Sequence, residues 1–423
     1  MLKDLSREIK IRIGIIFFSR VIGLIVFPFM AVHYSIVFGV AVASVLLVTN
    51  VIVQLSASLY GGYLTDFVGR RKIILSGEFV KTISFIGLAI CNSPFFVSHQ
   101  LTFIFILLII ACQGFMTPAV EASLLDICEE EQRSIMYSVN YWVMNFAIMS
   151  GVLIGGWFFL TNLFELMIGL SIVSTLTLLL TYIFIKESYS PVHKTYKPFN
   201  MLNVFKQYGP VVRDHPFLLF TLGGVSIVTI DFQRNNYIAT RLTEEMPNMN
   251  VELLGTLSLT LDGLRINSLL TVLNTILIIL LGSLILKAVK NKSKYALLYV
   301  GFMLFAIGFS FLSATNNILL LVVGVLILTI GELIYVPSRQ TILANVINEE
   351  KRGLYLAFNG LINHSSRLIA STMLPLGMFV GGKVMALMIL ILGGMAILFS
   401  YIAIKKYKDM NMSTVDHAKG ISS

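Results

Sequence analysis

Charged residues are scarce in this sequence. They make up 13% of its 423 residues, whereas about a quarter is usual in soluble domains. Hydrophobic residues reach 57%, more than a soluble protein could cover with polar groups. A helix needs about 20 apolar residues to cross a hydrocarbon core of roughly 30 Å, and several runs reach that length. The composition therefore predicts a polytopic membrane protein and excludes a large soluble enzyme domain.

Cysteine and catalytic motifs are also sparse. Cys91, Cys112 and Cys128 lie in or beside apolar runs and lack the spacing of a disulfide or a metal site. We interpret them as small apolar side chains. The sequence contains no metal-ligand cluster, nucleophile arrangement or phosphate-binding loop. We therefore expect no enzymatic activity, no cofactor and no metal, so active transport would depend on an ion gradient.

The apolar runs and their polar breaks predict twelve transmembrane helices. A polar stretch at 186–216 divides them six and six. The predicted organisation is a six-helix half (1–185), a cytoplasmic linker (186–215), a second six-helix half (216–404) and a cytoplasmic tail (405–423). The predicted spans are 12–34, 37–63, 73–92, 100–126, 137–160, 165–185, 216–240, 264–288, 295–314, 317–339, 354–379 and 384–404.

The net charge of +9 follows this predicted topology. If the N-terminus is inside, 24 of the 31 Lys and Arg residues fall in cytoplasmic segments. Such a bias in short loops sets the orientation of membrane proteins, so we expect both termini in the cytoplasm. The basic charge is then topological, and it gives no reason to expect nucleic acid binding. The first apolar stretch is too long for a signal-peptide core and is expected to remain as the first span.

The two halves carry a sequence repeat at an offset of 219 residues. Pro118 matches Pro337, and Arg133 matches Arg352. Asn140 likewise matches Asn359. Two parallel halves are typical of transporters that rock around a site near the bilayer midplane.

A charged loop follows the second predicted span and reads GYLTDFVGRRK at residues 62–72. Its glycines favour a tight turn and close helix approach, and Asp66 is suited to accept hydrogen bonds from a helix N-terminus. Arg70 is placed to pair with Asp126 at the end of span 4. Breaking such pairs would release one half from the other, so we interpret the loop as a gate. Its candidate residues are Gly62, Asp66, Gly69, Arg70, Arg71 and Asp126.

This loop resembles the signature of the major facilitator superfamily between spans 2 and 3, with Phe67 where Arg is frequent. The segment GVLIGG at 151–156 is similar to that superfamily's antiporter signature GPxxGG, with Val152 in place of Pro. Small residues also let helices pack closely, so a packing face remains the alternative. Ile110 occupies the Arg position of the span 4 signature, which excludes a proton relay through that Arg. The candidate glycines are Gly151, Gly155 and Gly156.

Over its whole length the chain resembles the twelve-helix drug:proton antiporters of Gram-positive bacteria, of the lactococcal multidrug exporter type. The resemblance implies an all-α membrane fold of two pseudo-symmetric six-helix bundles in a bacterial plasma membrane. In that type, carboxylates inside the membrane couple protons and attract cationic drugs. Asn140 and Asn235 stand at two of those positions, and Glu332 alone keeps a carboxylate.

Several polar residues are predicted within the membrane, where charges are costly and usually functional. Glu332 is our candidate for proton coupling, with a structural hydrogen bond near Pro337 as the alternative. Arg20, Arg234 and Arg367 would favour an anionic substrate, unless Arg234 pairs with Asp231 and Arg20 reaches the cytoplasm. The candidate cavity residues are Arg20, Gln113, Asn140, Arg234, Asn235, Glu332 and Arg367.

Three functions fit these observations. The first is a proton-coupled exporter of amphipathic small molecules that works by alternating access. The second is a dedicated exporter of an anionic or zwitterionic metabolite such as a metallophore, and the third is a non-transporting membrane scaffold or sensor. The expected partners are a small-molecule substrate, protons and the lipid bilayer, and we expect the protein to function as a monomer.

Overall fold

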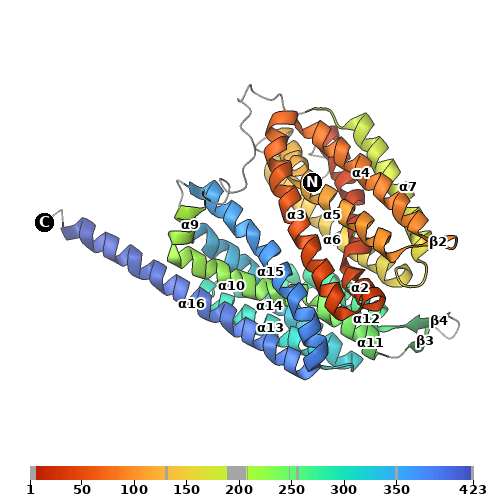
Figure 1. Ribbon diagram of the computed structural model, residues 1–423. Coiled ribbons are helices and arrows are strands. Elements are labelled where there is room, and N and C mark those ends of the chain that lie inside the picture. The colour runs from red at the N-terminus through yellow and green to blue at the C-terminus, as the bar shows by residue number, and fades with distance from the viewer. Residues whose placement is uncertain are drawn as a thin grey trace. The chain divides into compact units, whose positions relative to one another are not determined.

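The computed structural model describes residues 6–128, 132–187, 206, 208–246, 248–253, 257–347 and 351–420. The chain forms two compact units, Met1–Phe199 and Asn200–Ser423, which are described separately below (Figure 1). Most of the predicted linker, residues 188–205 and 207, lies outside the described residues, as do the last three residues of the predicted tail.

Unit 1 consists of helices joined by short connections. Its first span, Arg7–Phe38, contains two α-helices and a short 3₁₀ turn. Gly39, with φ of +81°, makes the turn into the second span, a backbone conformation that favours glycine. The elements are α1 (Arg7–Val26), η2 (Phe27–Phe29), α2 (Met30–Phe38), α3 (Val40–Val68), α4 (Arg70–Cys91), β1 (Asn92–Ser93), β2 (Phe96–Val97), α5 (His99–Asp126), α6 (Arg133–Phe158) and α7 (Leu163–Phe184).

Unit 2 has the same plan. Its first span, His215–Glu245, includes a π-helical turn, η4, in which the amide of Ile238 donates to the carbonyl of Gln233. The elements are α9 (Gly209–Arg213), α10 (His215–Phe232), η4 (Arg234–Ile238), α11 (Ala239–Glu245), β3 (Met249–Leu253), β4 (Leu257–Leu261), α12 (Gly263–Val289), α13 (Lys294–Ala314), α14 (Ile318–Val346), α15 (Arg352–Val380) and α16 (Gly382–Gly420).

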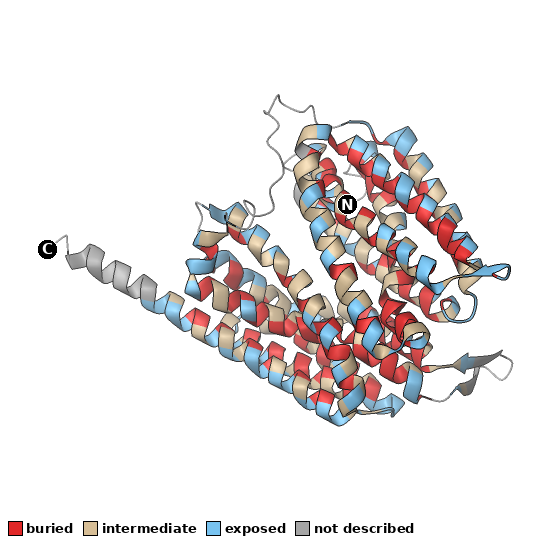
Figure 2. Cartoon of the chain, in the orientation of Figure 1, coloured by how far each residue is buried: buried red, intermediate tan, exposed pale blue. Residues whose placement is uncertain are grey.

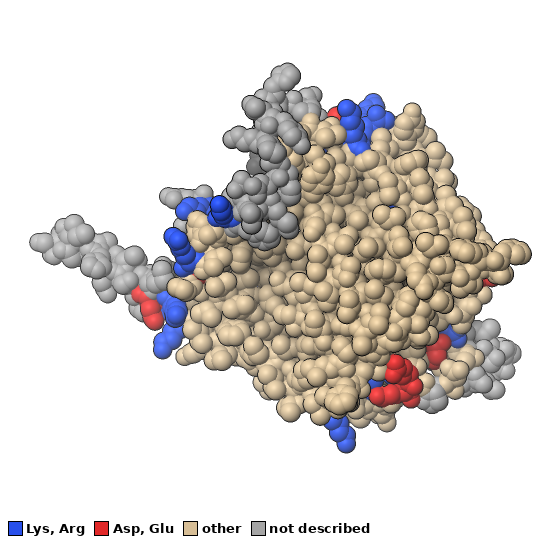
Figure 3. Space-filling view, viewed as in Figure 1, with Lys and Arg blue, Asp and Glu red and all other residues tan. Residues whose placement is uncertain are grey.

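The predicted all-α membrane fold is confirmed. Among the described residues, 11 helical segments are long and apolar enough to cross a membrane. The remaining predicted span is α15, whose 29 residues have the length but include Asn363, His364 and Arg367. Exposed residues alternate with buried ones along the helices (Figure 2). Broad surfaces between the helix ends carry no charged side chains in the view of Figure 3.

The internal repeat is visible in the helix boundaries. Three helices of unit 1, α5, α6 and α7, begin at His99, Arg133 and Leu163. Their counterparts α14, α15 and α16 begin 219 residues later in each case, at 318, 352 and 382. Residues of α5 and α14 therefore correspond one to one in the two halves.

Glycines bring α13 and α14 into close contact. A Cβ atom at Gly301 would lie 2.7 Å from the Cβ of Tyr335, and one at Gly331 would lie 2.8 Å from the carbonyl oxygen of Gly301. A Cβ at Gly308 would lie 2.6 Å from the carbonyl oxygen of Gly324. Small residues permit such close packing between membrane helices. This contact fixes the part of α14 that carries Glu332.

Two β-hairpins interrupt the helical pattern, and sequence analysis did not predict them. Strands β1 and β2 pair antiparallel between α4 and α5. Strands β3 and β4 pair antiparallel between α11 and α12. Both hairpins lie in connections between predicted spans, so the number of spans is unchanged.

Candidate functional site

The predicted gate loop forms the junction between α3 and α4. Gly69 separates the two helices with φ of +96°, a conformation that other residues rarely adopt. Arg70 and Arg71 are therefore the first two residues of α4, and their amides have no acceptor within the helix. Gly62 faces Pro118, to which an added Cβ would come within 3.7 Å. The side chain of Asp66 lies outside the described part of the structure.

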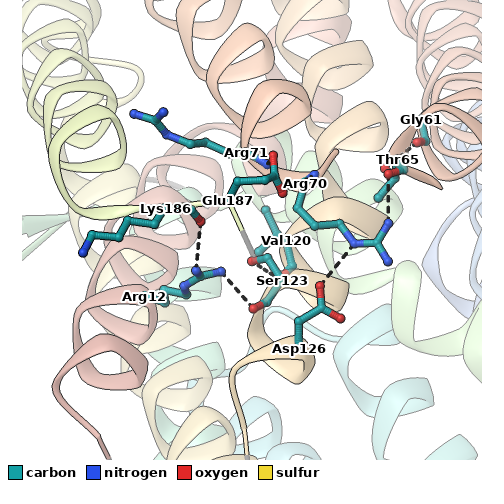
Figure 4. Close-up of polar contacts among 10 residues, drawn as sticks. All are labelled: Arg12, Gly61, Thr65, Arg70, Arg71, Val120, Ser123, Asp126, Lys186 and Glu187. Carbon is teal, nitrogen blue, oxygen red and sulfur yellow. Dashed lines mark hydrogen bonds and ion pairs between the residues drawn. The ribbon is translucent and has the colours of Figure 1, made fainter. Parts of the chain in front are cut away.

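Arg70 lies within a group of polar residues at the helix ends of unit 1 (Figure 4). We call Arg12, Arg70, Arg71, Asp126 and Glu187 the gate cluster. The Nε atom of Arg70 lies 3.4 Å from Oδ2 of Asp126 at the end of α5, so the predicted pair is present. Its Nη1 donates to the carbonyl oxygen of Thr65 at 2.9 Å. Because Arg70 is only 8% exposed, it connects α3, α4 and α5 in a partly desolvated position, where an ion pair is stronger than on an open surface.

Glu187, just beyond α7, caps the N-terminus of α4. Its two carboxylate oxygens accept hydrogen bonds from the backbone amides of Arg70 (3.0 Å) and Arg71 (3.1 Å). A carboxylate at this position satisfies two amides and complements the positive end of the helix dipole. Sequence analysis did not select Glu187. The available signal was an acidic residue directly after the last apolar residues of span 6.

Two further arginines bind backbone carbonyls around this cluster. Arg12 of α1 donates to the carbonyl oxygens of Ser123 (2.8 Å) and Lys186 (3.2 Å). Arg71 donates to the carbonyl oxygen of Tyr182 at 2.9 Å. Figure 4 shows Arg12 between the carbonyl groups of Ser123 and Lys186. The cluster thus joins the ends of α1, α4, α5 and α7 within unit 1.

The glycines of the antiporter-like segment pack against α1. A Cβ atom at Gly151 would lie 2.6 Å from the Cβ of Leu24, and one at Gly155 would lie 2.5 Å from the carbonyl oxygen of Ile25. Gly156 is also buried. This geometry supports the helix-packing interpretation of the segment.

Unit 2 contains a polar network inside its membrane spans. Arg234, which is only 7% exposed, donates from Nη1 to Oδ1 of Asn274 on α12 at 3.0 Å. The amide nitrogen of Asn274 donates in turn to Glu332 Oε2 at 3.3 Å and to Thr329 Oγ1 at 2.9 Å. Asn274 therefore bridges Arg234 and Glu332. Its signal in the sequence was an amide within an otherwise apolar span.

Asp231 is the second carboxylate beside Arg234. It lies at the end of α10, is exposed, and is close enough to interact electrostatically with both Arg234 and Glu332. The suggested Asp231–Arg234 ion pair is not formed, because Arg234 is directed to Asn274 and stacks on Phe309 at 5.2 Å. Two carboxyl groups therefore lie near one guanidinium group.

The other predicted cavity residues are divided between the two units. Arg20 is exposed on α1, while Gln113 of α5 lies next to Gly23. Arg367 of α15 stacks on Phe232 at 5.0 Å. Asn140 and Asn235 are both half-buried. Within unit 2, Arg234 and Glu332 are brought together through Asn274.

Comparison with known proteins identifies the family. The family model described as Major Facilitator Superfamily matches residues 13–371. The chain belongs to the Major Facilitator Superfamily. Its repeat and apolar helices are therefore those of a multi-pass membrane transporter of this superfamily.

Relatives within the superfamily include an antiporter of similar length. The chain is 27% identical over 410 residues to the Na(+), Li(+), K(+)/H(+) antiporter of Planococcus maritimus, which covers 95% of this chain and 96% of the relative. It is 28% identical over 145 residues to the uncharacterized MFS-type transporter YqjV of Bacillus subtilis, covering 33% and 34% of the two chains.

Solved structures share the fold. A POT family transporter in complex with a thioalcohol conjugated peptide has a TM-score of 0.72 at 16% identity and covers 95% of this chain and 96% of that chain. A POT family transporter in complex with 5-aminolevulinic acid has a TM-score of 0.70 at 16% identity, with coverages of 94% and 96%. At this identity the likeness concerns the fold alone.

Proposed function

We propose that this transporter is a proton-coupled antiporter that exports monovalent metal cations in exchange for protons. The observation that carries the proposal is the polar network within the spans of unit 2, in which Asn274 connects Arg234 to Glu332 and Asp231 lies near both charged groups. The full-length relative from Planococcus maritimus, a Na(+), Li(+), K(+)/H(+) antiporter, supports the choice of cargo.

The charges of this network suit a one-for-one exchange. With Asp231 and Glu332 ionised and Arg234 protonated, the three groups carry one excess negative charge. Uncompensated charge inside a membrane is costly, so the site favours either one proton or one monovalent cation. Competition between the two for the same carboxylates couples their movement, because binding of one displaces the other.

Antiport also requires that access to the site changes from one side of the membrane to the other, and we assign this step to the gate cluster of unit 1. Arg70, Asp126 and Glu187 connect the ends of α4, α5 and α7. In the proposed cycle this cluster stabilises one state of the gate, and its opening changes the side from which the site is reached. We place it at the cytoplasmic membrane surface, with both termini inside and the protein in the plasma membrane as a monomer.

Proton movement in vesicles tests the proposal. In everted vesicles that have built up a pH gradient, adding Na⁺, Li⁺ or K⁺ should release protons and restore the fluorescence of a pH-sensitive dye. Glu332→Gln and Asp231→Asn should each abolish this response. The matched control is Glu121→Gln on α5, an exposed carboxylate outside the network. A normal response in Glu332→Gln would refute the proposed coupling site.

Export of amphipathic compounds is a second candidate for the cargo, favoured by an aromatic surface on α6. Tyr137, Tyr141, Trp142 and Phe146 are each more than half exposed. Aromatic faces attract organic cations through cation–π contacts. The same vesicles supplied with ethidium distinguish the two cargoes. Proton release by ethidium and not by metal ions would select this candidate.

An anionic cargo is less well supported by the network. Arg234 donates to Asn274 and has Asp231 and Glu332 nearby, so an anion would meet two negative charges beside it. Arg20 is the exposed cation that an anion would require. Loss of transport in Arg20→Ala, with unchanged membrane insertion, would favour an anionic substrate over a metal cation.

A further inference from the structure

A cluster of lysines surrounds one tyrosine where three spans of unit 2 end. Helix α12 ends at Val289, α13 begins at Lys294, and the membrane-spanning part of α16 ends at Asp409. The lysines are Lys287, Lys290, Lys292 and Lys294 on the α12–α13 connection and Lys405, Lys406 and Lys408 on α16. In these segments, the described residues include seven lysines and one acid, Asp409.

Tyr295 organises the centre of this cluster. The ammonium group of Lys408 lies 4.3 Å from the centre of its ring, and that of Lys294 lies 5.5 Å from it. These cation–π contacts bring two positive charges from different helices to one side chain. A lysine ammonium group has three N–H donors, so contact with the ring leaves donors on each lysine for a ligand.

Neighbouring tyrosines indicate the depth of the lysine cluster in the membrane. The rings of Tyr299 and Tyr401 are 6.4 Å apart. Tyr299 lies about one turn after the start of α13, and Tyr401 lies about two turns before the membrane-spanning part of α16 ends at Asp409. The hydroxyl group of Tyr407 donates to the carbonyl oxygen of Asn345 at the end of α14. Tyrosines concentrate at the interface between hydrocarbon and headgroups. The lysines beyond them therefore lie at the level of lipid phosphates.

The charges of the cluster are available to a ligand. Within the described chain, none of the seven lysines has a carboxylate at ion-pair distance. Six of the lysines are exposed, and Lys294 is half-buried beside Tyr295. Clusters of four to eight basic residues directly beside membrane helices attract anionic lipids. A soluble anion would gain the same charge contacts but no contact with the apolar ends of the helices.

We propose that Lys294, Tyr295 and Lys408 form a binding site for the phosphate headgroup of an anionic phospholipid. The two ammonium groups hold the phosphate oxygens, and the acyl chains follow the exposed apolar surface of α16. Exposed side chains there include Leu398 and Tyr401. The bound lipid joins α13 to α16 at the membrane surface. The site is independent of the proposed transport function.

Lipid titration of the purified full chain tests this site. Native mass spectrometry in detergent, after delipidation, would follow binding of phosphatidylglycerol and of phosphatidylcholine with the same acyl chains. Lys294→Gln combined with Lys408→Gln should lower the affinity for phosphatidylglycerol by about 25-fold, because each surface lysine contributes about fivefold. Tyr295→Leu keeps both charges and should lower the affinity by about two- to fivefold.

The matched control removes two exposed lysines that do not touch Tyr295, by Lys405→Gln combined with Lys406→Gln. Lys405 and Lys406 are not placed against the ring of Tyr295 as Lys294 and Lys408 are, so the control should lose less affinity than Lys294→Gln combined with Lys408→Gln. Size-exclusion chromatography checks that each variant folds. The proposal is overturned if both pairs lose affinity equally, if phosphatidylcholine binds as tightly, or if inorganic phosphate displaces the lipid at equal concentration.

Discussion

The buried ion pair of Glu78 and Lys81 allows a quantitative test of how unit 1 is stabilised. Lys81 is fully buried and Glu78 is 3% exposed, and their charged atoms approach to 2.6 Å within α4. Ser19 of α1 accepts a hydrogen bond from Lys81 at 2.9 Å. Ser19 also donates to Glu78 at 3.3 Å. Lys81 and Glu78 share this one serine hydroxyl group, so the pair links α1 to α4.

Removing one partner should be costly. Lys81→Met leaves a buried carboxylate with only a serine hydroxyl group, and Glu78→Leu leaves a buried ammonium group. Such uncompensated charges destabilise proteins by about 3–5 kcal/mol, and for a unit of this size about 1 kcal/mol corresponds to roughly 2–4 °C. Each single variant should therefore unfold about 6–20 °C below the parent protein.

The double variant provides the decisive comparison. Replacing a buried ion pair by apolar residues of similar volume is often nearly neutral, so Glu78→Leu combined with Lys81→Met should recover most of the lost stability. The assay is thermal unfolding in detergent, followed by the fraction of protein that remains monodisperse after heating. If the double variant lost as much stability as the two single variants together, the two charges would not depend on each other, which would refute this reasoning.

Three further variants test contacts at helix ends and between packed helices. Gly61→Ala should lower the free energy of unfolding by about 1–3 kcal/mol, because the new Cβ collides with a backbone carbonyl of α5. The control Gly14→Ala has open space around the new Cβ and should have little effect. Equal unfolding temperatures of the two variants would contradict the expected collision. Glu187→Gln weakens the cap of α4 and should cost about 1 kcal/mol, measured as a lower unfolding temperature than that of Glu121→Gln. Arg241→Gln removes hydrogen bonds to two carbonyls of unit 2 and should speed amide hydrogen exchange in α11; unchanged exchange would show that these bonds do not hold the helix.

Much of the fold was predictable because the bilayer imposes a simple rule on sequence. A helix that crosses hydrocarbon must be apolar for about 20 residues, so the polar breaks located the spans. Span 1 shows the limit of this rule. It was predicted to begin at residue 12 but begins at Arg7, because Ser6 caps the helix by accepting a hydrogen bond from the amide of Ile9. Arg12 then lies inside the helix and finds carbonyl partners there. The short β-hairpins have no comparable pattern and were not predicted.

The candidate sites were predicted less completely, for a different reason. Arg70 and Asp126 belong to a recognisable motif, and Glu332 is conspicuous as an acid in an apolar run. Their partners Glu187 and Asn274 lie on other helices, and a polar residue becomes a partner only through tertiary packing. The expectation that Asp231 pairs with Arg234 followed from their spacing of three residues. The π-helical turn that begins at Arg234 changes that geometry, so Arg234 reaches Asn274 instead.

The exact correspondence of α5 and α14 has an evolutionary consequence. Gln113 occupies in α5 the place that Glu332 occupies in α14, and Ile110 stands opposite Thr329. One copy of the repeated helix thus carries an ionisable group, while the other carries a neutral amide at the same position. A duplicated fold leaves its two halves free to specialise. In the proposed cycle, selection would act on unit 1 mainly through the rate at which the transporter changes state, and on unit 2 mainly through what it exchanges.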